Sequence, residues 1–188
     1  MKRLFAFFLT LTLMGCAIGG GTPVNDFTNR ATIYGWINVD KISGNHLYSM
    51  TMRQYAPRSE QPFYDMGIKK FEGGYLVWQH AAKPGSRIEF HSMALQSCAA
   101  IICSNTINEY DFGPFGSAPG KVDVQRPGVH YIGNWALVRT KRGFFGPGEF
   151  DTRRVRSGPS RAQLLAELMK TLPEGHPIVG QRIQAAAR

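Results

Sequence analysis

The sequence predicts a mainly β protein, an antiparallel β-sandwich of about seven strands followed by a short helical tail. Three observations favour this fold class. The 188 residues include 21 glycines, 11 prolines and 12% aromatic residues, a composition typical of short strands joined by turns. Segments rich in β-branched and aromatic residues alternate between two faces along most of the chain. Apolar residues recur at helical spacing near the C-terminus.

The N-terminus has the pattern of an export signal. Lys2 and Arg3 precede an apolar stretch over residues 4–14, which is shorter than the roughly 20 residues of a transmembrane helix. The segment Leu13-Met14-Gly15-Cys16 follows and resembles the lipobox of bacterial lipoproteins. The resemblance implies a signal peptide over residues 1–15 and cleavage before Cys16. It also implies a diacylglyceryl group on the Cys16 sulfur and an acylated amine, with palmitate as an expected acyl chain.

Residues 16–27 are expected to form a flexible tether, because glycines follow the lipidated cysteine. Several acyl chains make a stable membrane anchor, whereas one chain gives marginal binding. Ala17, in place of Asp, resembles the pattern of lipoproteins sorted to the outer membrane, which implies an envelope protein facing the periplasm. The alternative is an ordinary signal peptide in which Cys16 occurs by chance.

Cys98 and Cys103 are the two cysteines that remain after Cys16. In an oxidising compartment an even pair normally forms a disulfide, and four intervening residues allow a loop or hairpin closure. The alternative is a metal site that these thiols form with His91. It would need a fourth ligand, and the spacing matches no zinc motif. The sequence therefore predicts a Cys98–Cys103 disulfide.

The β domain is expected over residues 28–156. Alternation of apolar and polar residues predicts strands over 31–39, 46–55, 74–81, 87–95, 121–124, 129–138 and about 148–155. In the first of these, Ile33 and Ile37 share one face, and Tyr34 and Trp36 share the other. Turn signals rich in glycine and proline occur over 43–45, 83–86 and 126–128. Residues 56–61 and 104–120 are expected to be loops.

The C-terminal segment, residues 157–188, is expected to be helical. Ser160 to Gln163 resembles a capping box, and a stripe of apolar residues follows on one helical face. The stripe consists of Leu164, Leu165, Leu168, Met169 and Leu172. A second helix is expected over residues 177–187. We expect the stripe to pack on the β domain, and the alternative is a face that binds a partner.

Two further segments carry a resemblance to a family. Pro84-Gly85 leads into Arg87-Ile88-Glu89-Phe90, and a second run extends from Val124 through Pro127-Gly128 to Gly133-Asn134. Over about residues 30–140 this resembles bacterial lipoproteins that carry a prealbumin-like or carboxypeptidase-regulatory-like β-sandwich. The matching residues are turn and core residues. The resemblance therefore implies a fold and a location but no reaction.

Residues suited to catalysis or metal binding do not form a known motif. The histidines have no metal-ligand spacing, no serine lies in a GxSxG motif, and the carboxylates are scattered. His80, His91 and His130 are interpreted as hydrogen-bonded structural residues. We therefore predict no catalytic residue, no metal and no cofactor. Four phenylalanines near glycines offer an alternative apolar binding tip: Phe112, Phe115, Phe144 and Phe145.

Positive charge is concentrated between residues 139 and 161. The segment holds Arg139, Lys141, Arg142, Arg153, Arg154, Arg156 and Arg161 against Glu149 and Asp151. An exported location argues against a nucleic-acid ligand and favours anionic lipid or an acidic envelope protein. The first six of these residues are the candidate site for an anionic surface. The alternative is a solvated basic face that only keeps the domain soluble.

These observations predict a membrane-anchored, non-enzymatic lipoprotein that acts as a binding or accessory module of the cell envelope. Two alternatives remain open. One is a structural subunit of an envelope transport or secretion assembly, and the other is a periplasmic hydrolase.

Overall fold

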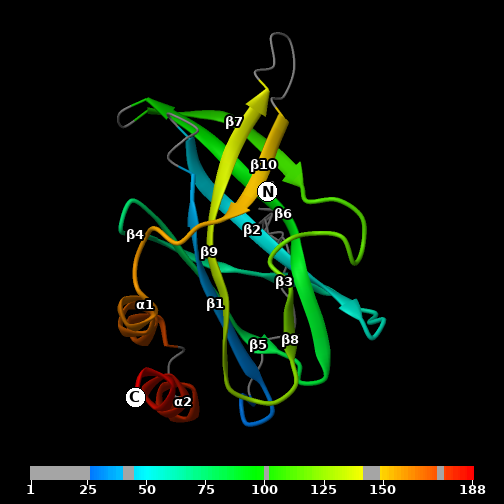
Figure 1. The fold of residues 1–188 in the computed structure, drawn as a ribbon, viewed down its shortest axis with the longest axis vertical. Helices are drawn as coiled ribbons and strands as arrows, with labels where there is room; N and C mark the ends of the chain where they lie inside the picture. Colours follow the sequence, from blue (N-terminus) through cyan, green and yellow to red (C-terminus); the bar gives the residue numbers. More distant parts are fainter. Residues whose placement is uncertain (1–25, 40–44, 100–101, 142–148, 173–175) are drawn as a thin grey trace, which may run out of the picture.

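Strands make up most of the part of the chain that the structure, a computed structural model, describes. That part comprises residues 26–39, 45–99, 102–141, 149–172 and 176–188. For residues 45, 97–99, 102, 104–106, 108, 139–141 and 149–150 only the backbone is described. The elements are β1 (Ala31–Asn38), β2 (Asn45–Ala56), β3 (Phe63–Asp65), β4 (Gly67–Phe71), β5 (Gly74–Ala82), β6 (Ser86–Ala99), β7 (Ile102–Asp111), β8 (Val122–Val124), β9 (Val129–Lys141), β10 (Glu149–Arg154), α1 (Arg161–Leu168), a 3₁₀ helix (Met169–Thr171) and α2 (Pro177–Ala187) (Figure 1).

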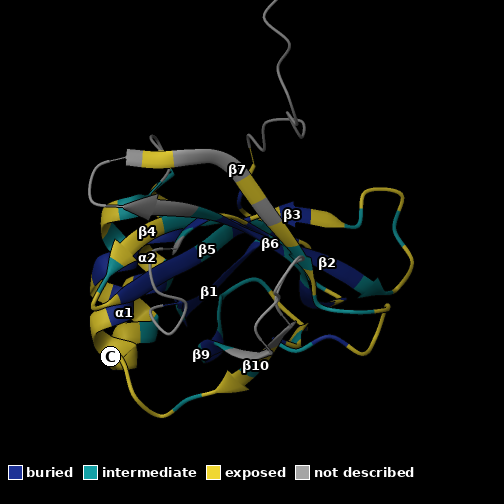
Figure 2. Ribbon diagram, turned by 90° about the horizontal axis from the view of Figure 1, so that it is seen from above, coloured by how far each residue is buried: buried dark blue, intermediate teal, exposed yellow. Residues whose placement is uncertain are grey.

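The strands form two sheets. One has the order β10-β9-β1-β5-β4, and the other has the order β3-β2-β6-β7, with β8 also paired to β6. Strands β1, β5 and β6 are largely buried, whereas the described side chains of β10 are mostly exposed (Figure 2). The fold is therefore mainly β, with two sheets and two short α-helices, in agreement with the predicted fold class at that level.

One strand pair departs from the predicted antiparallel arrangement. β1 runs parallel to β9, with Tyr34 opposite Tyr131 and Trp36 opposite Asn134. Parallel neighbours need a long connection. Here the chain that connects β1 to β9 includes all the strands of the second sheet. Alternation within each strand cannot reveal such a pairing, because it reports which face is buried and not which strand is the neighbour.

The prediction of about seven strands is too low for the described residues, which form ten. The additional strands are β3 and β4, of three and five residues, and β7. The predicted loop over residues 104–120 is wrong for residues 104–111, which belong to β7. β7 is an end strand rich in polar residues, and its backbone conformation comes from pairing with β6. An apolar pattern is not needed for such a strand.

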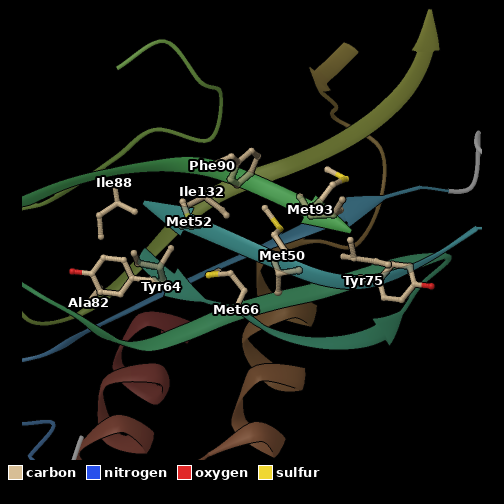
Figure 3. Close-up of a cluster of buried hydrophobic side chains, with 14 of the residues drawn as sticks. Met50, Met52, Tyr64, Met66, Tyr75, Ala82, Ile88, Phe90, Met93 and Ile132 are labelled. Carbon is tan, nitrogen blue, oxygen red and sulfur yellow. The ribbon is translucent and has the colours of Figure 1, made fainter. Parts of the chain in front are cut away.

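A hydrophobic cluster draws side chains from both sheets (Figure 3). The first sheet contributes Ile33, Ile37 and Val77, and the second contributes Met50 and Phe90, all at most 2% exposed. Burial of each such side chain stabilises the fold by about 1.5–3 kcal/mol. Ile33 and Ile37 thus lie on a core face, as the alternation of β1 predicts.

Bulges change which side chains enter this core. Strict alternation predicts that Leu47 faces away from Met50, and that Met93 faces away from Phe90. All four side chains nevertheless belong to the inter-sheet cluster. The β2–β6 pairing shifts register between Leu47 and Ser49, and again where His91 has no partner on β2. An extra residue in one strand moves the following side chains to the opposite face.

The opposite face of β1 and β5 is covered by the C-terminal helices (Figure 1). Tyr34, Trp36 and Leu76 form a second cluster there with buried residues of both helices: Leu164, Leu165 and Leu168 of α1, and Val179 and Ile183 of α2. The capping box is confirmed, because Ser160 accepts from the Gln163 amide and Gln163 accepts from the Ser160 amide. The predicted packing of the apolar stripe on the β domain is confirmed by this cluster.

Arg182 of α2 joins the end of the chain to its beginning. Its guanidinium donates to the backbone carbonyls of Phe27 (2.9 Å), Arg30 (2.8 Å) and Thr28 (2.6 Å). The Phe27 ring also packs on His176, with ring centroids 4.3 Å apart. The segment that leads into β1 is therefore attached to the last helix.

Candidate functional site

A surface hollow of about 630 Å³ lies where β9, the end of β10 and the start of α1 meet. Its lining consists of Tyr131, Gly133, Asn134, Arg154, Val155, Arg156, Pro159, Ser160 and Arg161. Three of these side chains are arginines, and the lining contains no Asp or Glu. This is the part of the described structure in which the basic segment forms a concave site.

Asn134 holds the wall of the hollow in place. Its side-chain Nδ2 donates to the carbonyls of Pro159 (3.1 Å) and Ser157 (3.3 Å), and its backbone carbonyl accepts from the Val155 amide (2.9 Å). Its Oδ1 accepts from the Tyr131 hydroxyl at 2.6 Å. Asn134 is 7% exposed, so these bonds are largely shielded from water. The turn that connects β10 to α1 is thereby fixed against β9.

Gly133 allows the close approach of Arg154. Its φ is +105°, a conformation that L side chains rarely adopt, and a Cβ atom built there would lie 3.1 Å from Arg154 Nε. The β1–β9 pairing has a register shift at this point, between Tyr34 and Trp36 of β1. The bulge therefore places backbone, rather than a side chain, beneath the arginine.

Two tyrosine side chains, Tyr34 and Tyr131, contact the guanidinium of Arg161. Its Nε donates to the Tyr34 hydroxyl at 3.0 Å, and its Cζ lies 6.0 Å from the centroid of the Tyr131 ring. Burial raises the pKa of Tyr34, although the hydrogen bond and charge of Arg161 oppose that rise. Burial also raises the pKa of Tyr131, against the charges of Arg154 and Arg161. Both phenols therefore stay neutral at pH 7 and leave the arginine charges uncompensated.

The structure divides the predicted basic residues into three groups. Arg154 and Arg156 line the hollow, together with Arg161. Arg153 lies outside it and pairs with Asp151 at 2.9 Å, with both side chains at least half exposed. The side chains of Arg139 and Lys141, and the whole of Arg142, lie outside the described residues. Among described residues, none of the ion pairs includes Arg154, Arg156 or Arg161.

The sequence did not identify Tyr131, Gly133 and Asn134 as site residues. All three belong to the run ending in Gly133-Asn134, which was interpreted as structural. The signal that could have identified them is Gly133 inside a predicted strand, because an isolated glycine there often marks a bulge, and bulges are common near functional sites.

The other candidate residues lie elsewhere. His80 Nδ1 lies 3.0 Å from Thr32 Oγ1, His91 Nδ1 lies 3.3 Å from Arg53 Nη1, and His130 Nε2 lies 3.0 Å from the Arg126 carbonyl. In the part of the chain that is described, no group of three or more His, Cys, Asp or Glu residues could hold a metal ion.

The two predicted disulfide partners are opposite each other in the ladder. Cys98 of β6 pairs in register with Cys103 of β7. β6 and β7 are consecutive strands of the sequence and pair with each other antiparallel. The Cys98 side chain lies outside the described residues, so the disulfide stays a prediction. Residues 1–25 also lie outside the described residues, so the signal peptide and the lipidation of Cys16 stay predictions as well.

Of the four phenylalanines proposed as an apolar tip, two are described. Phe112 is half-buried and packs on Phe90, with centroids 5.3 Å apart, whereas Phe115 is 60% exposed. Phe144 and Phe145 lie outside the described residues. The two described phenylalanines therefore differ in exposure, and the predicted apolar tip as a whole stays untested.

The arrangement in the hollow is suited to binding an anion. Guanidinium groups stay charged at all physiological pH values and present planar pairs of donors that match phosphate and carboxylate oxygens.

None of the described helices is long and apolar enough to cross a membrane. No protein-family model matches the chain, and comparison with curated proteins finds no match.

Proposed function

We propose that this protein is a lipid-anchored lipoprotein of the cell envelope whose β-sandwich domain binds anionic groups without catalysing a reaction. The observation that carries the proposal is the hollow in which Arg154, Arg156 and Arg161 converge without a described acidic partner. Like charges are brought together at a cost that binding of an anion offsets. Lipid headgroups with a net negative charge, such as phosphatidylglycerol, are a source of anionic groups at a membrane surface.

The lipid anchor is a separate part of this proposal. It rests on the lipobox Leu13-Met14-Gly15-Cys16 and the apolar stretch before it. We expect Cys16→Ser to shift the protein out of the membrane fraction and to abolish the mass added to the wild-type chain by acylation. A wild-type chain without added mass, together with a Cys16→Ser variant that stays membrane-bound, would contradict the anchor.

The binding function is tested with a chain that lacks residues 1–16. Those residues are outside the described part, so every described contact is kept. We expect this chain to float with phosphatidylglycerol vesicles but not with phosphatidylcholine vesicles. Binding should weaken steeply as salt is raised, because exposed charges are screened beyond about 8 Å at physiological ionic strength.

A matched pair of variants separates the hollow from general charge. Arg154→Gln/Arg156→Gln should weaken vesicle binding by about fivefold for each arginine. Arg87→Gln/Arg126→Gln removes the same charge from two exposed arginines elsewhere and should have a smaller effect. If the two double variants bind equally well, the hollow has no special role.

The two alternatives predict different results. A structural subunit of an envelope assembly should co-purify with a partner and show no salt-dependent vesicle binding. A hydrolase should lose activity when His80, His91 or His130 is replaced.

A further inference from the structure

Two exposed phenylalanines line a second hollow, beside β3 and the end of β2. The described large hydrophobic side chains that are exposed include Phe63, at 52%, and Phe115, at 60%. Both line a groove of about 600 Å³ together with Tyr55 and with the polar side chains of Arg58, Ser59 and Glu60. The groove is distinct from the arginine hollow, because the two share no lining residue.

A buried ion pair holds Phe115 in its exposed position. The side chains of Arg53 and Glu89 are 3% and 0% exposed, and Arg53 Nε donates to Glu89 Oε1 at 2.9 Å. Glu89 Oε1 also accepts from the Gly116 amide at 2.7 Å, and Arg53 Nη2 donates to the Gly113 carbonyl. Desolvation of a buried pair is costly. Here the pair fixes the loop that carries an exposed aromatic ring.

The same cluster supports both rings from the inside. Arg53 Cζ lies 4.3 Å from the centroid of the Phe115 ring, and the Phe63 ring packs on His91 with centroids 4.7 Å apart. Arg53 Nη1 lies 3.3 Å from His91 Nδ1. Since one face of each ring is covered, the exposed area belongs to the faces and edges that point outward. Two rigid apolar surfaces are thus presented beside the groove.

The polar residues of the groove are balanced in charge. Arg58 supplies one cation and Glu60 one anion, and neither forms an ion pair with a described residue. A guanidinium donates and a carboxylate accepts, while a serine hydroxyl does both. Because the lining holds one charge of each sign, it favours neither an anion nor a cation over a neutral ligand. A ligand that fits must offer apolar faces to the rings and neutral donors and acceptors to these side chains.

A peptide added as an extra strand fits less well. The nearest sheet edge is β3, which has only three residues, and its Asp65 carbonyl already accepts from Gln79 Nε2 at 2.7 Å. Strand addition depends on a row of free backbone groups along an edge. This edge is too short to provide one.

We propose that the groove between Phe63 and Phe115 binds a neutral saccharide chain. The C–H faces of pyranose rings pack on the outward faces of the two phenylalanines, and the hydroxyls exchange hydrogen bonds with Arg58, Ser59 and Glu60. This site is independent of the proposed binding of anions, and either can fail without the other.

The test uses the full-length protein in a zwitterionic detergent, because glycoside detergents carry saccharide headgroups that would compete. Chitotetraose, maltotetraose and cellotetraose serve as probes, and saturation-transfer difference NMR detects binding through the sugar protons. We expect at least one probe to bind, with transfer to its ring C–H protons. Phe63→Ala and Phe115→Ala should each weaken that binding by about tenfold.

Tyr48→Ala is the matched control, since Tyr48 is 58% exposed on β2 and does not line the groove. It should bind the probe as the wild type does. Loss of the ring contacts with Arg53 and His91 should lower the thermal midpoint of the two phenylalanine variants slightly. A cooperative unfolding transition in each variant shows that it is folded. The proposal is overturned if none of the three probes binds, or if both phenylalanine variants bind as well as the control does.

Discussion

The side-chain nitrogen of Asn134 lies 3.1 Å from the carbonyl oxygen of Pro159, so a residue in the middle of β9 fixes the turn that begins α1. The same side chain accepts from Tyr131 and donates to Ser157. One amide thus positions both the tyrosine and the turn that line the arginine hollow. The shape of the hollow depends on it.

Asn134→Ala should therefore weaken both stability and anion binding. Loss of these largely buried hydrogen bonds leaves carbonyls unsatisfied and should lower the free energy of unfolding by about 1–3 kcal/mol. Vesicle binding should fall with it, because the turn is released. Urea denaturation and vesicle flotation measure the two effects. A variant that loses stability but binds phosphatidylglycerol vesicles normally would show that the turn does not shape the site.

Gly133→Ala should also act on both properties. Strain at φ +105° should cost about 1–3 kcal/mol, and the new Cβ would press on Arg154 Nε. Gly85→Ala is the control, since its φ is +81° but nothing lies within 4 Å of its Cβ position. Both variants should lose stability in denaturation experiments, and only Gly133→Ala should lose vesicle binding. Equal binding by the two would exclude a role for the Gly133 backbone.

His80 should make the stability of the fold depend on pH. Burial lowers the pKa of His80 to about 4, although the backbone of Thr171 acts in the opposite direction. Between about pH 4 and the usual histidine pKa near 6.5, the unfolded chain binds the proton more readily than the folded chain does. Stability should therefore rise with pH across this window, by up to roughly 3 kcal/mol. Below about pH 4 this residue should cause no further loss.

The variant that tests this is His80→Gln, which keeps a polar side chain beside Thr32 but cannot titrate. Urea denaturation at several pH values should show a flatter dependence between pH 4 and 6.5 for this variant. An unchanged slope in His80→Gln would assign the pH dependence to other groups.

The predicted Cys98–Cys103 disulfide is tested by thiol labelling. The opposed positions of the two residues on β6 and β7 support the pairing. The mature chain, unfolded without reductant, should not react at either cysteine, and reduction should lower the free energy of unfolding by about 2 kcal/mol. Full labelling before reduction, or tightly bound zinc, would contradict the disulfide.

Local patterns predicted the elements that depend on local interactions. The Ser160–Gln163 capping box and the faces of β1 follow from spacing alone, since helix caps and strand alternation involve near neighbours. Spacing could not predict that Leu47 and Met93 enter the core, because the bulges arise from the pairing of β2 with β6. It could not predict β7 either, a polar strand that depends on its neighbour.

The same limit applies to the site. Charge density along the chain indicated the basic segment, and Arg154 and Arg156 are indeed in the hollow. Charge density could not separate them from Arg153, whose charge is compensated by Asp151 two residues away. It also could not identify Asn134, because its bonds to Ser157 and Pro159 cross more than twenty positions of sequence.

The attachment of Arg182 to the carbonyls of Phe27, Thr28 and Arg30 determines how the domain responds to mechanical force. A pull on the chain ahead of Phe27 would first act on these three hydrogen bonds and on α2. It would reach β1 only afterwards, and β1 lies between β9 and β5, so that two ladders must separate before it moves. A chain that ends before α2 would transmit the same pull directly to the first residues of β1. The last helix therefore protects the central strand of its sheet from force that arrives at the other end of the chain.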